Sequence, residues 1–197
     1  MIWLASQSPR RADLLRQVGV AFELLVADAD EDSEALEVRI GREAPARYVT
    51  RVCALKAQAA LQRLERRGLP RRPILCADTT VSQGSTIHGK PVDAADAAAI
   101  LSQLSGTTHR VLTAVTVVDT SRIESALSIS TIRMAALDAK TIDAYVASGE
   151  PFGKAGAYAA QGRGAAFIEH LSGSHSGVIG LPLHETMRLL ASFNIRP

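Results

Sequence analysis

The chain has 197 residues, of which 47% are hydrophobic and 21% are charged, and its formal net charge is +2. This composition can fill a hydrophobic core and fits one domain, or a compact two-lobed one, over residues 1–197. The near-neutral charge argues against nucleic acid as a partner, and no apolar run is long enough to span a membrane. The apolar run at residues 2–5 is too short for a secretory signal, so we expect a cytoplasmic protein.

The N-terminal segment predicts a strand, a polar turn and a helix. Residues 2–5 form a short apolar run, Ser8 suits the N-cap, and Pro9 suits the first helical position. Arg10 and Arg11 then fall in the first turn, where cations are mildly unfavourable beside free backbone N–H groups. We interpret the pair as part of a phosphate site at a helix N-terminus. The alternative is two solvated arginines.

A strand is expected at residues 22–26, and an acidic stretch follows at residues 28–34. Most acidic loops are simply solvated. One carboxylate of this stretch could instead join Asp78 around a divalent cation, because hard cations prefer oxygen ligands.

A long helix is predicted from about residue 45 to residue 67, because apolar residues recur there at helical spacing. Lys56 lies on the apolar face, where an unpaired lysine is rare. It could extend to water at the edge of the face, or it could reach a phosphate, and we favour the phosphate. Arg63 lies near the same face, but the helix end should let it reach water.

The segment from Pro73 to Val92 gives the first candidate for chemistry. The apolar run at residues 74–77 predicts a buried strand, and Asp78 follows it directly. A carboxylate at the end of a buried strand must be paired, bind a metal or face a cleft. The alternative, an aspartate that accepts hydrogen bonds from nearby backbone amides, is equally compatible with this segment.

The C-terminal half mixes strands and helices without strict alternation, so we predict an α/β protein with a mixed central sheet and flanking helices. Gln161 lies in a glycine-rich loop whose backbone could approach a ligand closely. The expected elements are a helix capped by Asp93 that stops near Gly106, a hairpin of residues 109–118 and 123–132, a helix at 139–148, a loop at 152–164, a strand at 166–170, a loop at 172–182 and a helix at 183–193.

Short motifs lie along the chain at residues 4–11 (LASQSPRR), 77–79 (ADT), 89–91 (GKP), 104–106 (LSG), 145–151 (YVASGEP), 154–158 (KAGAY), 161–162 (QG) and 180–183 (GLPL). Taken together and in order, they resemble the Maf family of nucleoside triphosphate pyrophosphatases, in its dTTP/UTP branch. The resemblance implies hydrolysis of a nucleotide to its monophosphate and pyrophosphate with Mg²⁺ or Mn²⁺, in a cleft between two lobes of an inosine triphosphatase-like fold. It also implies a possible homodimer.

The resemblance also implies roles for individual residues. Asp78 matches the proton acceptor, and Glu31 matches an acidic position near the metal. The specificity positions are Arg10, Thr79 and Gln161, and the phosphate-binding positions are Ser8, Arg11, Lys56 and Lys90. A different class of function, a nucleotide-sensing regulator of cell division, would not need Asp78.

Overall fold

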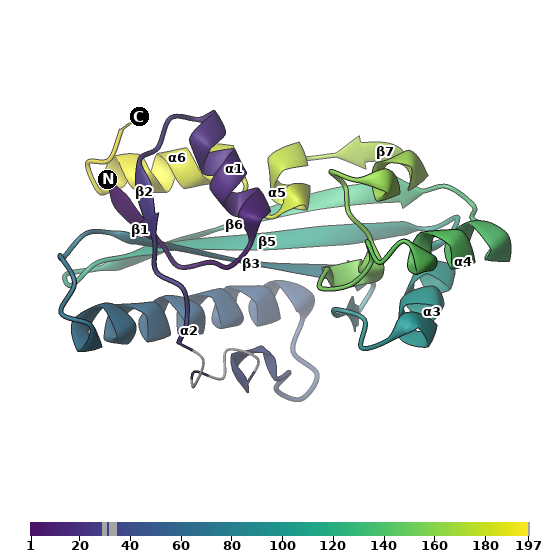
Figure 1. Cartoon of the computed structure of the whole chain (residues 1–197), viewed down its shortest axis with the longest axis horizontal. Coiled ribbons are helices and arrows are strands. Elements are labelled where there is room, and N and C mark those ends of the chain that lie inside the picture. The colour runs from purple at the N-terminus through teal and green to yellow at the C-terminus, as the bar shows by residue number, and fades with distance from the viewer. Residues whose placement is uncertain (29–30, 32–34, 197) are drawn as a thin grey trace.

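The structure is a computed structural model, and it describes residues 1–28, 31 and 35–196. Figure 1 shows an elongated molecule in which long strands run along the long axis and both termini lie near one end. The strands are β1 (Ile2–Leu4), β2 (Phe22–Leu24), β3 (Ile74–Gln83), β4 (Thr86–His88), β5 (Thr108–Val118), β6 (Ile123–Met134) and β7 (Ile168–Ser172). The helices are α1 (Pro9–Gln17), α2 (Pro45–Arg66), α3 (Ala94–Leu104), α4 (Ala139–Ala147), α5 (His175–Ile179) and α6 (Leu183–Ser192), and short 3₁₀ turns cover Ala35–Glu37, Ala155–Ala157 and Arg163–Phe167.

The described strands form one mixed sheet in the order β2-β1-β3-β5-β6-β7, with β4 also paired to β3. β1 is parallel to both of its neighbours, whereas β3, β5, β6 and β7 pair in antiparallel fashion. α2 covers one face of the sheet, and α1 and α6 cover the other (Figure 1). A third apolar cluster under α3 and α4 closes the far end. The prediction of a mixed sheet with flanking helices is confirmed.

Along one edge of β3, the paired strands leave a gap beside Asp78. β5 pairs with β3 from Ile74 to Ser82 along the opposite edge. On the edge with the gap, β1 pairs only as far as Leu75, and β4 begins to pair at Val81. The residues between them therefore border a gap in the sheet. Open sheets bind ligands where a neighbouring strand ends, and this gap is such a place.

Some predicted boundaries were wrong. β3 continues past Ala77 to Gln83, because β5 offers it a long antiparallel partner, so Asp78 lies within the strand and not at its end. The predicted loop at 172–182 contains α5, whose N-cap Ser174 accepts a hydrogen bond from the Gly177 N–H. The predicted strand at 166–170 lies two residues further along, as β7.

Two histidines are buried in the third cluster. His109 is 1% exposed, and its Nε2 lies 2.8 Å from the Tyr158 hydroxyl. Its Nδ1 and the Nε2 of His88 have no hydrogen-bond partner among the described residues. Burial, together with the nearby His88, lowers the pKa of His109 to about 4. Neutral imidazoles in this cluster are therefore part of the folded state.

We expect this burial to make stability depend on acid pH. The pKa of His109 is 6.5 in the unfolded chain and about 4 in the folded one. The contribution of neutral His109 to the free energy of unfolding is therefore fully present above pH 6.5 and is lost as the pH falls towards 4. The loss is about 3 kcal/mol for this group. Urea unfolding from pH 7 to pH 4 would measure it, with His109→Gln as the control that cannot titrate. Parallel stability curves for the two proteins would contradict the prediction.

Candidate functional site

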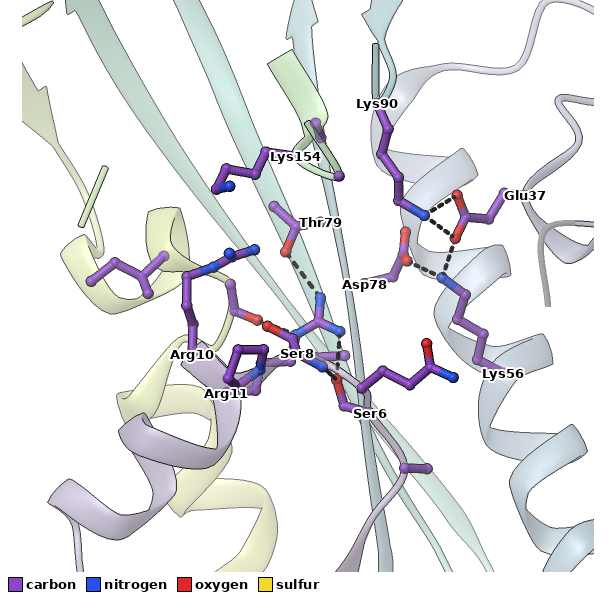
Figure 2. A pocket seen from close by; sticks show the side chains of 18 of the residues that line it. Ser6, Ser8, Arg10, Arg11, Glu37, Lys56, Asp78, Thr79, Lys90 and Lys154 are labelled. Carbon is purple, nitrogen blue, oxygen red and sulfur yellow. Dashed lines mark hydrogen bonds and ion pairs between the residues drawn. The ribbon is translucent and has the colours of Figure 1, made fainter. Parts of the chain in front are cut away.

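A cleft of about 640 Å³ opens beside the gap in the sheet. Its walls are the N-terminal turn of α1, the middle of β3, one side of α2, the loop at 153–161 and the end of α5. Since adjacent strand residues point to opposite faces, Asp78 faces α2 while Thr79 faces α1 and α5. Figure 2 shows the two resulting groups of side chains on either side of β3. The cleft therefore continues around the open edge of the strand.

On the α2 side, two lysines and two carboxylates form one network. The Lys56 Nζ lies 2.5 Å from Asp78 Oδ1 and 2.7 Å from Glu37 Oε1. The Lys90 Nζ lies 3.3 Å from both Glu37 oxygens (Figure 2). Lys56 therefore does not extend to water, which was one of the two alternatives from the sequence; the other, contact with a phosphate, stays a prediction. Lys56 holds the two carboxylates at the cleft.

The protonation of Asp78 is set by two opposed effects. Burial raises its pKa, and the ion pair with Lys56 lowers it, with the net result above the ordinary value. At Glu37 burial also raises the pKa, but Lys56 and Lys90 together bring it below the ordinary value. A carboxylate of raised pKa in a cleft is a usual mark of a general base, and Lys56 is the group that keeps it ionised.

On the α1 side, the partners of Arg11 in the described part of the chain are neutral oxygens. Its guanidinium donates to Gly180 O at 2.8 Å, to Ser6 Oγ at 3.2 Å and to Thr79 Oγ1 at 3.4 Å. The Ser8 N–H donates to Ser6 Oγ at 3.2 Å, and Ser8 stands at the N-cap without a side-chain capping bond. The positive charge of Arg11 is fixed in place, and no carboxylate of the described residues pairs with it, so this wall is suited to an anion.

Arg10 and Lys154 extend this positive wall (Figure 2). Among the described residues, the Arg10 guanidinium has no hydrogen-bond partner, and Lys154 Nζ donates only to the carbonyls of Glu150 and Phe152. Burial and then the neighbouring Arg11 lower the pKa of Arg10, and burial and then Arg10 lower the pKa of Lys154. Cations that repel one another in a half-buried cleft are stabilised when an anion binds between them.

The remaining candidates lie at the rim. Gln161 lines the cleft and is exposed, and its side chain has no hydrogen-bond partner in the described part of the chain. Glu31 also lines the cleft, but its carboxylate is 2.5 Å from both Arg63 Nη2 and Arg66 Nη2. Arg63 was expected to reach water; it is instead 6% exposed and also donates to Leu25 O at 2.9 Å.

The structure thus brings the residues named from the sequence to one cleft and adds two that were missed. Glu37 was missed because nothing local marks it, and its partner Lys56 is 19 residues away. Lys154 had a usable signal, a lone lysine in a glycine-rich segment. Asp30, Asp32 and Glu34, the other carboxylates of the acidic stretch, lie outside the described residues.

The carboxylates at the cleft are the candidate ligands for a divalent cation. Within residues 1–28, 31 and 35–196, no group of three or more His, Cys, Asp or Glu side chains could hold a metal ion. Asp78 and Glu37 are nevertheless two carboxylates bound to the same ammonium group at the cleft. Mg²⁺ is usually held in nucleotide enzymes by one or two carboxylates, with phosphate oxygens and water completing its shell. The chemistry of the pair therefore fits.

The fold and site together describe a mixed α/β protein with a cleft for a polyanion. A family model described as Maf-like protein matches residues 1–193. A dTTP/UTP pyrophosphatase from Albidiferax ferrireducens is 59% identical over 195 residues, which cover 99% of this chain and 98% of that protein. One of the same name from Ralstonia nicotianae is 62% identical over 191 residues, covering 96% and 92%. The chain belongs to the Maf-like protein family.

Solved structures give a weaker similarity. The crystal structure of a nucleoside-triphosphatase / dITP/XTP pyrophosphatase from Mycobacterium abscessus has a TM-score of 0.43 at 17% identity, over 70% of this chain and 76% of that one. A similarity of this size carries no conclusion about the predicted inosine triphosphatase-like fold. In the part of the chain that the structure describes, no helix combines the length and the apolar character of a membrane span.

Proposed function

We propose that this chain hydrolyses dTTP and UTP to the nucleoside monophosphate and pyrophosphate. The observation that carries the proposal is the cleft, in which a buried carboxylate, Asp78, faces an excess of cations at the open edge of β3. The names of relatives at 59% and 62% identity support the choice of substrates. No observation favours the alternative of a nucleotide-sensing regulator, for which a buried base would be superfluous.

The proposed reaction is attack of water on the α-phosphorus, with pyrophosphate as the leaving group. Such catalysis consists mainly of positioning and charge neutralisation. Asp78 Oδ1 is bound to Lys56, and Oδ2 has no hydrogen-bond partner among the described residues, so Oδ2 is the atom that would take a proton from water. Arg10, Arg11 and Lys154 would bind phosphate oxygens on the other side of the strand.

Glu37 would hold the divalent cation, either Mg²⁺ or Mn²⁺, while Asp78 acts as the base; direct binding of the metal by Asp78 stays a prediction. When bound, the cation would neutralise phosphate charge and lower the pKa of water. Lys90 would bind phosphate oxygens on this side of the strand, while Lys56 stays paired with Asp78; phosphate binding by Lys56 itself stays a prediction. Glu31 as a metal ligand stays a prediction, and so do a cytoplasmic location and a homodimer.

Release of pyrophosphate from a panel of nucleotides tests the function. Purified protein with Mn²⁺ or Mg²⁺ would be assayed on dTTP, UTP, dATP and GTP, with products separated by chromatography. We expect dTMP or UMP together with pyrophosphate, and slower cleavage of the purine nucleotides. Absence of turnover on every nucleotide would overturn the proposal and favour a sensor.

Gln161 is the residue that we expect to read the base. A uracil or thymine edge presents carbonyl acceptors around an N–H donor, and a side-chain amide can both donate and accept. An ionised glutamate can only accept and would repel a carbonyl. Gln161→Glu should therefore lower kcat/KM for dTTP and UTP by roughly ten- to a hundredfold, with a smaller effect on dATP and GTP.

The matched control for this prediction is Gln103→Glu, the same change at an exposed position on α3. It should leave all four kcat/KM values near those of the wild type. If Gln161→Glu lowers the values for purines and pyrimidines equally, Gln161 does not read the base.

A further inference from the structure

Gln161 is exposed, so its position depends on how the backbone on either side of it is held. The Ala159 N–H donates to the Tyr145 hydroxyl at 3.0 Å. The Arg163 and Gly164 N–H groups donate to the two oxygens of the Glu150 carboxylate, each at 3.0 Å. Gln161 thus lies midway between two anchored stretches of backbone.

Glu150 and Tyr145 form one unit. The Tyr145 hydroxyl donates to Glu150 Oε1 at 2.8 Å while it accepts from Ala159, so both anchors of the loop end on the same carboxylate. Tyr145 is 2% exposed, and its ring packs edge-on against Phe167 with the centroids 4.9 Å apart. The unit is therefore anchored in the third apolar cluster, of which Tyr145 is a member.

The loop backbone lies directly against these two side chains. A Cβ added at Gly162 would lie 2.5 Å from a Glu150 oxygen, and one added at Gly164 would lie 2.7 Å from the Tyr145 hydroxyl. Both glycines therefore allow the backbone to approach the anchoring atoms. The fit leaves no room for a water molecule between the loop and Glu150 at these points.

Glu150 carries its charge at neutral pH. Burial raises its pKa, but the hydrogen bonds from Gly164, Arg163 and Tyr145 bring it below the ordinary value. Hydrogen bonds to an ionised acceptor are about twice as strong as neutral ones. The backbone of the loop is therefore held by the negative charge of the Glu150 carboxylate.

We propose that Glu150 and Tyr145 are positioning residues for base recognition: they hold the backbone at residues 159–164 so that the Gln161 amide is presented to the pyrimidine edge before substrate binds. The inference rests on the proposed function and adds two residues to it. A loop ordered in advance loses less conformational entropy on binding. Only a base that forms hydrogen bonds with both the donor and the acceptor of the Gln161 amide requires the ordered loop, so a pyrimidine gains most from this saving.

The test is Glu150→Gln, which keeps the shape of the side chain and removes the charge. We expect faster hydrogen exchange at the Arg163 and Gly164 amides. We also expect the ratio of kcat/KM for dTTP to kcat/KM for GTP to fall roughly tenfold, which equals about 1.4 kcal/mol. Tyr145→Phe keeps the ring and removes the hydroxyl, so it should free the Ala159 amide and lower the same ratio.

The control is Asp138→Ala, which removes the N-cap of α4, the helix that carries Tyr145, without touching the loop. It should lower the melting temperature and leave the nucleotide ratio unchanged. If Glu150→Gln and Tyr145→Phe fold and keep the wild-type ratio, the inference is overturned whatever the exchange data show. If the wild type itself has no pyrimidine preference, the proposed substrate choice fails and the inference falls with it.

Discussion

Asp78→Asn is expected to lower kcat/KM for dTTP by about 10²–10⁴-fold, the usual effect of removing a positioned general base. The carboxylate lies in the cleft with raised pKa and with one oxygen free of partners among the described residues. Asparagine has almost the same shape, and its carbonyl oxygen can still accept from Lys56. The fold should therefore remain intact while proton transfer from water is lost.

Asp13→Asn is the control for this experiment. Asp13 lies on the exposed side of α1, where its side chain is 66% exposed and, among the residues that the structure describes, pairs with Arg16 alone. Exposed pairs of this kind contribute little to stability, so the control should retain wild-type activity and melting temperature. Near-normal turnover in a folded Asp78→Asn protein would rule out Asp78 as the base.

Lys56→Ala is expected to lower kcat/KM at neutral pH by about ten- to a hundredfold, the equivalent of one lost hydrogen bond between charged groups. It should also change the pH profile in a defined direction. Burial raises the pKa of Asp78, and Lys56 is the group that opposes this. Without Lys56 the pKa of Asp78 rises further, so the acid limb of the kcat/KM profile should move to higher pH.

Two other lysine variants show whether the charge is responsible. Lys56→Arg keeps a cation beside Asp78, so its acid limb should stay near the wild-type position even if the rate falls. Lys140→Ala removes an exposed lysine from α4 and should change nothing. If Lys56→Ala has wild-type kinetics at every pH and only a changed melting temperature, Lys56 is structural and the account of Asp78 is wrong.

Elements with strong local signals could be predicted from the sequence. The bounds of α2 follow from apolar residues at helical spacing and from Gly68, which adopts a positive φ of 60° just after the helix. Asp93 caps α3 as expected, by accepting from the Asp96 N–H. The hairpin of β5 and β6 forms as its two alternating segments indicate. In each case the information lies within a few residues of the feature.

The features that could not be predicted depend on partners far away in the chain. β3 extends through Asp78 because β5, which is distant in the sequence, pairs with it from Ile74 to Ser82. Lys56 pairs with Asp78 and Glu37, and Arg63 pairs with Glu31, because the folded chain brings these distant residues together. α5 has five residues with a glycine among them, too short for a periodic pattern. The candidate residues were thus visible, but their pairing was not.

The most direct test of the proposed function is hydrolysis of dTTP in water enriched in ¹⁸O, followed by mass spectrometry of both products. If water attacks the α-phosphorus, one ¹⁸O atom will appear in dTMP, and the pyrophosphate will contain none. Asp78→Asn should form neither product at a comparable rate. Label in the pyrophosphate, or release of single phosphate with dTDP, would contradict the account, because the bond broken would then not be the one proposed here.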